Sequence, residues 1–79
     1  MENFKKTFYA ILINKLKVNQ YELTPEKLFY DLGLNSLDMV ELIIEFEKAY
    51  RINIPDEVLE NLVSVGDAEN YLKLRLNIT

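Results

Sequence analysis

The sequence predicts an all-α fold, a small four-helix bundle with three main helices, a short third helix and a long loop between helices one and two. Apolar residues recur at helical spacing in separate segments, and no segment alternates apolar and polar residues as a strand would. With only two Gly and two Pro in 79 residues, these patterns are rarely interrupted. A chain of this length has room for one core, so we expect a single domain over residues 1–79.

The first predicted helix spans about residues 2–17. Its apolar residues recur at spacings of four, three, one and four, and therefore share one face. They are Phe4, Phe8, Ile11, Leu12 and Leu16. This pattern predicts an amphipathic helix with lysines mostly on the outer side.

Residues 18–34 form a predicted loop, because the helical periodicity fades there. Thr24-Pro25-Glu26 predicts at most one short turn of helix. Apolar residues are expected to hold the loop on the core: Leu23, Leu28, Phe29 and Leu32. A connection this long either carries function or wraps the core.

The second predicted helix begins after Asn35, a favoured N-cap residue, and Asp38 can reach back to complete a capping box. It should end near Tyr50 or Arg51, because a residue preceding Pro55 is disfavoured in the α region.

Pro55 opens a short third helix with Asp56 and Glu57 in its first turn. Ser64, with Asp67 three residues later, caps a last helix through about residue 75.

Three faces can be distinguished on the second helix. The core face comprises Met39, Leu42, Ile43, Phe46 and Tyr50. An acidic stripe is formed by Asp38, Glu41 and Glu45 and extended by Lys48, and taken alone it is best interpreted as the ordinary solvent face of a helix. A further apolar face is formed by Leu37, Val40 and Ile44. The further face is either covered by another helix or the loop, or it anchors a partner beside the acids. We favour docking for Leu37 and Ile44 and leave both alternatives open for Val40.

Composition excludes several classes of site. With no cysteine and no histidine, the chain cannot form disulfides, thiolate or imidazole metal sites, or a Ser-His pair. Its carboxylates are predicted on exposed helical faces, so we expect no catalysis. A calcium loop from Asp31 fails because Leu42 stands where a bidentate Glu is needed. We therefore expect no metal site.

A net charge of -4 disfavours nucleic acid and anionic membranes, and favours either a basic protein partner or plain solubility, depending on where the charges lie. No apolar run approaches the length of a membrane span, and the N-terminus lacks a signal-peptide pattern, so we expect a cytoplasmic protein. Met1 and the complete set of helices favour a free-standing protein. We also expect a monomer.

The Ser36 hydroxyl has no assigned structural role, because Asn35 is the N-cap residue of the helix. At the first turn of a helix a phosphodiester on this hydroxyl would be electrostatically favoured, although plain helix initiation also accounts for a serine there.

The run Asp31-Leu32-Gly33-Leu34-Asn35-Ser36-Leu37-Asp38, continuing as Val40-Glu41-Leu42, resembles the phosphopantetheine attachment signature of acyl carrier proteins. The likeness extends through Ile54-Pro55-Asp56-Glu57 and residues 64–72. It implies an antiparallel bundle in which a phosphopantetheinyl transferase attaches 4′-phosphopantetheine from coenzyme A to Ser36. Acyl groups would then be carried as thioesters on the arm, for fatty-acid, polyketide or related lipid synthesis.

The resemblance also implies partner and cargo residues. The partners would be the transferase and the acyl-activating, acyl-transfer or synthase enzymes, with basic docking patches. Residues expected to meet them are Leu37, Asp38, Val40, Glu41, Ile44, Glu45, Asp56 and Glu57. Candidate walls for an acyl group are Phe46, Leu59 and Leu62, for which core packing alone is the competing interpretation.

One departure from the family pattern is Asn35, where the family usually has Asp. The cap survives, but a negative charge beside Ser36 is lost, and Lys48 and Arg51 also reduce the acidity of helix two. We therefore hypothesise a specialised carrier. The alternatives are a peptidyl or aminoacyl carrier and a carrier-like interaction module that stays unmodified.

Overall fold

Three α-helices and three short 3-10 segments form the fold in the computed structural model, which describes residues 2–77, with side chains from residue 4 onward. The helices are α1 (Glu2–Leu16), α2 (Ser36–Tyr50) and α3 (Val65–Arg75), and the 3-10 segments are η1 (Gln20–Glu22), η2 (Tyr30–Leu32) and η3 (Asp56–Asn61). Within these residues no strand forms, and an isolated bridge links Leu28 to Ser64. The predicted all-α class is confirmed.

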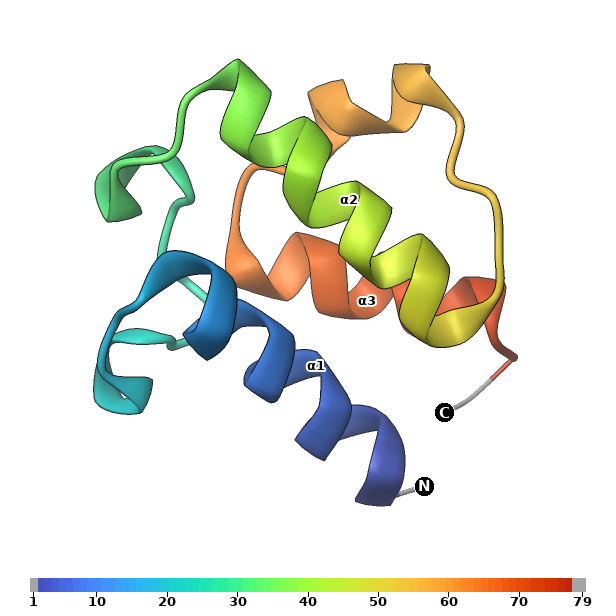
Figure 1. Ribbon diagram of the computed structural model, residues 1–79, viewed down its shortest axis with the longest axis horizontal. Coiled ribbons are helices and arrows are strands. Elements are labelled where there is room, and N and C mark those ends of the chain that lie inside the picture. Colours follow the sequence, from blue (N-terminus) through green and yellow to red (C-terminus); the bar gives the residue numbers. More distant parts are fainter. Residues whose placement is uncertain (1, 78–79) are drawn as a thin grey trace.

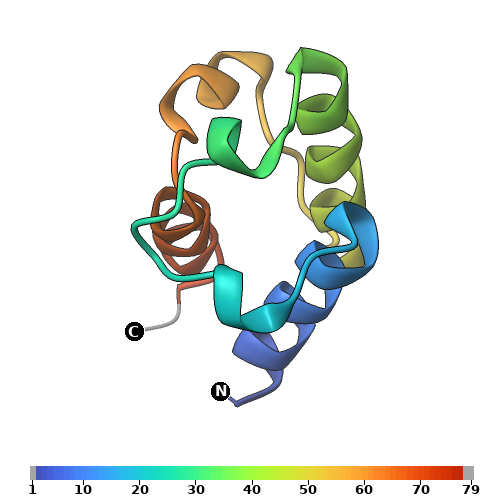
Figure 2. The ribbon, with the colours of Figure 1, turned by 90° about the vertical axis from the view of Figure 1, so that its left-hand side faces the viewer.

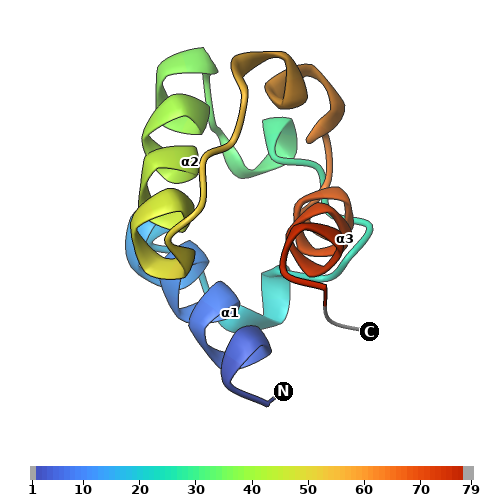
Figure 3. The same cartoon turned by 90° about the vertical axis from the view of Figure 1, so that its right-hand side faces the viewer.

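The helices enclose one apolar core, with α1 running against the direction of α2 and α3 (Figure 1). Views from the two sides show the three helices around a common centre, with the long loop and η3 closing the remaining sides (Figures 2 and 3). The buried apolar side chains are Phe4, Phe8, Leu12, Leu23, Phe29, Leu42, Ile43, Phe46, Ile54, Leu62, Val65, Ala68 and Leu72.

An aromatic column, formed by Phe4, Phe8, Phe46 and Tyr50, joins α1 to α2. The rings of Phe8 and Phe46 stack with centroids 5.4 Å apart and planes 8° from parallel. Phe4 extends the stack at 5.9 Å from Phe8, and the Tyr50 hydroxyl donates a hydrogen bond to the Phe4 carbonyl at 3.0 Å. The core faces predicted for the first and second helices therefore meet in this column.

The long loop contains two 3-10 segments that the sequence did not predict, η1 and η2. The turn predicted at Pro25 is present, closed by a hydrogen bond from the Lys27 N–H to the Thr24 carbonyl at 3.0 Å. Leu23 and Phe29 are buried as predicted. The prediction for Leu28 is wrong, since its side chain is 38% exposed.

Leu28 faces outward because its neighbour Phe29 takes the core side. Leu28 forms the isolated bridge to Ser64, whereas Phe29 already takes the helical conformation that leads into η2, and its side chain is 3% exposed. The Phe29 N–H bonds to the Val63 carbonyl at 2.9 Å, which fixes this register.

Backbone hydrogen bonds fasten the loop to the start of α3. The carbonyls of Lys27 and Pro25 accept from the N–H groups of Val65 and Gly66, each at 2.9 Å. These bonds satisfy two of the N–H groups that a helix leaves free at its start. A Cβ at Gly66 would lie 3.0 Å from the Pro25 carbonyl oxygen, so the close approach favours glycine, and a larger residue would push this part of the loop away. The loop therefore wraps the core, which is one of the two roles that its length suggested.

The second helix ends where predicted, but for a different reason. Arg51 adopts the left-handed conformation (φ 58°), and its N–H bonds to the Glu47 carbonyl. The last helical residue, Tyr50, therefore lies five residues before Pro55, and the left-handed Arg51 ends the helix instead of the proline.

The predicted third helix is present as η3, a 3-10 helix of six residues. Pro55 precedes it at the N-cap position, and no side chain caps its free N–H groups. At the start of α3, Ser64 and Asp67 form the predicted capping box. Among the described residues, no helix combines the length and apolar character needed to cross a membrane.

Candidate functional site

A reciprocal capping box fixes the start of α2. The Asn35 side-chain carbonyl accepts from the Asp38 N–H at 2.9 Å, and the Asp38 carboxylate accepts from the Asn35 N–H at 3.0 Å. Ser36 is the first residue of the helix, and its side chain is exposed. Because Asn35 and Asp38 form the cap, the Ser36 hydroxyl is free for another role.

The turn ahead of Ser36 is also fixed. Gly33 has φ 85°, a conformation that strains any residue with a Cβ, and its N–H bonds to the Tyr30 carbonyl at 3.0 Å. The Leu34 N–H bonds to the Phe29 carbonyl at 3.3 Å, and Leu34 packs against the core. Ser36 is therefore presented on an ordered backbone.

The electrostatics at Ser36 suit an anion. It begins a helix of 15 residues, whose free N–H groups and dipole give the start a partial positive charge. A phosphodiester on Ser36 would lie at this end, with the Asn35–Asp38 box leaving the hydroxyl accessible. The residues present thus fit a phosphopantetheine group.

The further apolar face of α2 is uncovered. Leu37, Val40 and Ile44 are 65%, 40% and 41% exposed. Neither another helix nor the loop covers Val40. Of the two alternatives left open for this residue, a covered position is therefore excluded. Leu37 lies next to Ser36, so the apolar face begins directly at the proposed attachment point.

The acidic stripe makes an ion pair that the sequence did not reveal. Glu41 forms an ion pair with Lys15 of α1, with 3.2 Å between Nζ and Oε1. Asp38 is engaged in the capping box, and Glu45 is half-buried. Of the three, Glu41 is the most accessible, while Asp56 and Glu57 are exposed at the start of η3.

A cleft of about 170 Å³ lies between α2 and η3. It is lined by Val40, Ile43, Ile44, Glu47, Ile54, Asp56 and Leu59. Leu59 is the one predicted wall residue that lines it. Phe46 and Leu62 are buried in the core instead, Phe46 with 1% of its surface exposed.

Glu47 holds the segment beside the cleft in place, a role that the sequence did not indicate. Its carboxylate accepts a hydrogen bond from the Ile54 N–H at 2.7 Å, which ties the segment after Arg51 to α2. The two residues come together only because the chain turns back at Arg51, so no local pattern could have indicated the contact.

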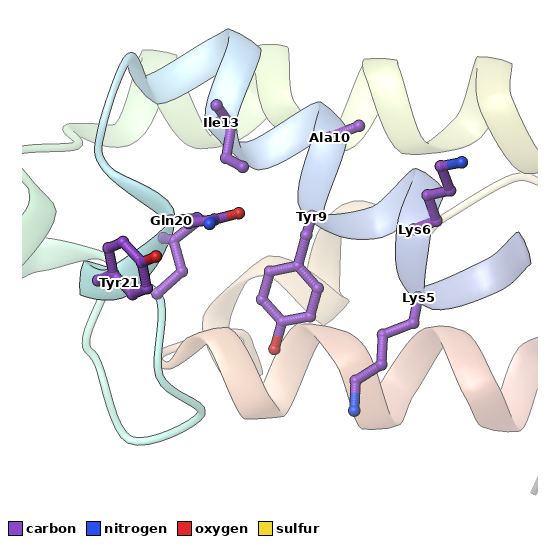
Figure 4. Close-up of a pocket in the computed structure, with 8 residues that line it drawn as sticks. Lys5, Lys6, Tyr9, Ala10, Ile13, Gln20 and Tyr21 are labelled. Carbon is purple, nitrogen blue, oxygen red and sulfur yellow. The ribbon is translucent and has the colours of Figure 1, made fainter. Parts of the chain in front are cut away.

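A larger hollow of about 590 Å³ lies between α1 and η1, away from the lining of the cleft (Figure 4). Lys5, Lys6 and Tyr21 border it, and Tyr9 points toward α3. The Tyr9 hydroxyl donates to the buried Glu69 at 3.3 Å. Burial, and secondarily the charge of Glu69, raises the pKa of Tyr9. The described side chains include no cluster of three or more metal-ligating residues.

Comparisons with known proteins agree with this geometry. Residues 6–72 match the sequence model of a family described as "Phosphopantetheine attachment site". The acyl carrier protein of Karelsulcia muelleri (strain GWSS) is 46% identical over 69 residues, 86% of this chain and 83% of that protein. The acyl carrier protein of Amoebophilus asiaticus (strain 5a2) is 43% identical over 77 residues, 96% of each chain.

Proposed function

The chain belongs to the acyl carrier protein family, and we propose that its 4′-phosphopantetheine arm is attached to the Ser36 hydroxyl. The family relationship establishes an acyl carrier function and a phosphopantetheine group. The observation that supports Ser36 is its exposed hydroxyl at the first residue of α2, left free by the Asn35–Asp38 box.

The attached group supplies a thiol, which this chain lacks because it has no cysteine. On loading, a bond forms between Ser36 Oγ and a phosphorus atom of coenzyme A, and the pyrophosphate bond breaks. Adenosine 3′,5′-bisphosphate leaves, and the Ser36 proton is taken up by the transferase. The start of α2 then stabilises the phosphodiester charge.

An acyl group would enter the cleft between α2 and η3. Leu59 lines this cleft, and Ile43 and Ile54 present further apolar surface to it. Phe46 and Leu62 lie in the core behind and would be reached only if the cleft widened. We propose that these residues hold the cargo without changing it, so the chain contributes no catalysis of its own.

The proposed partners are the transferase and the acyl-activating, acyl-transfer or synthase enzymes of a fatty-acid or related lipid pathway in the cytoplasm. They would dock on the exposed apolar face of α2, formed by Leu37, Val40 and Ile44. Glu41 is exposed on α2, Asp56 lines the cleft together with Val40 and Ile44, and Glu57 follows Asp56 in η3 with its side chain exposed. These acids support a basic partner patch.

Intact mass tests the attachment site. The protein is incubated with coenzyme A, magnesium and a broad-specificity phosphopantetheinyl transferase, alongside Ser36→Ala. A phosphopantetheine-sized increase in the native chain alone supports Ser36. An increase in both places the arm elsewhere, and no increase in a folded chain indicates an unmodified interaction module. Loading followed by acceptance of aminoacyl but not acyl groups would indicate a peptidyl carrier.

A further inference from the structure

The exposed side of α2 changes its charge along its length. Leu37, Glu41, Ile44, Lys48 and Arg51 follow one another at spacings of four, three, four and three, so they lie on one side of the helix and its cap. Acidic side chains lie toward Ser36, whereas Lys48 and Arg51 lie at the far end. Both cations are exposed, and the ion pairs found among the described residues involve neither of them.

Ile44 and Glu47 each line two hollows, which differ in their remaining charged residues. One is the cleft with Asp56 and Leu59. The other is a groove of about 470 Å³, which Ile44 shares with Lys48, Arg51 and Ile52.

Glu47 and Asn53 complete the lining of this groove. The Glu47 carboxylate is half-buried and accepts from the Ile54 N–H, which leaves the two exposed cations as the charges most accessible to a partner. The groove therefore combines two apolar side chains, Ile44 and Ile52, with two exposed cations and the Glu47 carboxylate that is engaged by the Ile54 N–H.

The two ends of α2 are far enough apart to be sensed separately. At 1.5 Å per residue, Glu41 and Lys48 are roughly 10 Å apart along the axis. This distance is comparable to the Debye length of about 8–10 Å at physiological salt. A uniformly basic partner patch that covers the whole face is attracted at one end and repelled at the other.

We propose that Lys48 and Arg51 form a selectivity element of the docking surface, which receives an acidic side chain of the partner enzyme. A partner with basic groups near Ser36 and an acid beyond Ile44 would be favoured over a uniformly basic one. Discrimination of this kind combines an attractive contact with a repulsive one. The inference rests on the proposed carrier function and its docking face.

The alternative is that both cations only stabilise the carboxyl end of α2 through its dipole. That role would change the melting temperature when the charges are removed, but not the rate of an enzyme that docks on α2. A kinetic comparison with a charge-matched control therefore separates the two roles.

The test measures kcat/KM for loading by a phosphopantetheinyl transferase whose docking patch is uniformly basic. Lys48→Gln/Arg51→Gln should raise kcat/KM about three- to tenfold at low salt, and the gain should shrink as salt increases. Lys5→Gln/Lys6→Gln removes the same charge from α1 and should change kcat/KM by less than about twofold. Glu41→Lys should lower kcat/KM.

Equal gains in the two double variants would overturn the proposal, because net charge alone would then explain them. No gain in Lys48→Gln/Arg51→Gln would overturn it as well. A second experiment tests the acidic contact directly. Single acidic substitutions are introduced into the transferase, one at a time, along the edge of its basic patch. At one position or more, the acid should improve loading of the native chain and not of Lys48→Gln/Arg51→Gln, and failure at every position refutes an acidic contact.

Failure of the carrier function itself is distinguishable from failure of this inference, because then no variant would gain the mass of the arm. Melting curves of all variants, read before the kinetics, show that each is folded.

Discussion

Asn35 and Asp38 each accept a hydrogen bond from the other's backbone N–H, and Ser36 lies between them in sequence with its hydroxyl outside the pair. The helix start is thereby held without using the residue proposed for modification. Since Asn and Asp are equivalent as caps, the identity of residue 35 can be changed to vary charge while the cap is kept.

Asn35→Asp should accelerate loading while leaving stability nearly unchanged. The cap is retained, and one negative charge is added beside Ser36, so kcat/KM with a basic transferase should rise about two- to fivefold at low salt. Asn35→Ala should lower the free energy of unfolding by about 1 kcal/mol, because the cap is lost. Loading kinetics and denaturant titrations measure the two effects. Slower loading of Asn35→Asp would contradict the role given to this charge.

Leu37→Ala and Ile44→Ala should each speed dissociation of a partner enzyme. Both side chains are exposed on α2, so their truncation should cost little folding energy but about 1–2 kcal/mol of binding, roughly a tenfold increase in the dissociation rate. Stopped-flow binding with the loaded protein measures this rate. Leu74→Ala is the matched control, because Leu74 is 80% exposed on α3. An equal effect of Leu74→Ala would argue against a docking face on α2.

Phe46→Ala should lower the free energy of unfolding by about 3–5 kcal/mol. Phe46 is almost fully buried and stacks on Phe8, so the substitution opens a cavity in the aromatic column. Urea unfolding monitored by circular dichroism measures the loss. An unchanged transition midpoint would mean that Phe46 does not lie in the core.

Tyr50 should make the fold sensitive to alkaline pH. Burial raises the pKa of Tyr50 to about 12, whereas an unfolded tyrosine titrates near about 10. Between these values the unfolded chain binds fewer protons than the folded one, so stability is fully present below about pH 10 and falls as pH rises toward about 12.

Tyr50→Phe should remove this part of the alkaline loss. It should cost about 1 kcal/mol at neutral pH, because the hydrogen bond to the Phe4 carbonyl disappears. Thermal melts at pH 8 and pH 11 compare the two chains. The same drop in melting temperature in both would show that Tyr50 is not responsible.

The helices could be predicted because their signals are local. The capping boxes at Asn35 and Ser64 use residues three positions apart, and the core face of α2 follows from periodicity alone. The exposure of Leu37 and Ile44 could be predicted for the same reason: both lie outside that core face.

Contacts between distant segments could not be predicted in the same way. Lys15 meets Glu41 only because α1 packs against α2, and Glu47 meets Ile54 only after the turn at Arg51. The outward direction of Leu28 depends on the register set by Phe29. Apolar character alone does not reveal which of two neighbours faces the core.

The aromatic column has a mechanical consequence for the bundle. Stacked rings tie α1 to α2, while η3 has no side-chain cap and contains no buried residue. The α1–α2 side of the bundle is therefore expected to be more rigid than the side formed by η3. An outward movement of η3 should be the deformation that costs least free energy. If the bundle expands to take up an acyl group, we expect η3 to move outward while the contact between α1 and α2 keeps its geometry.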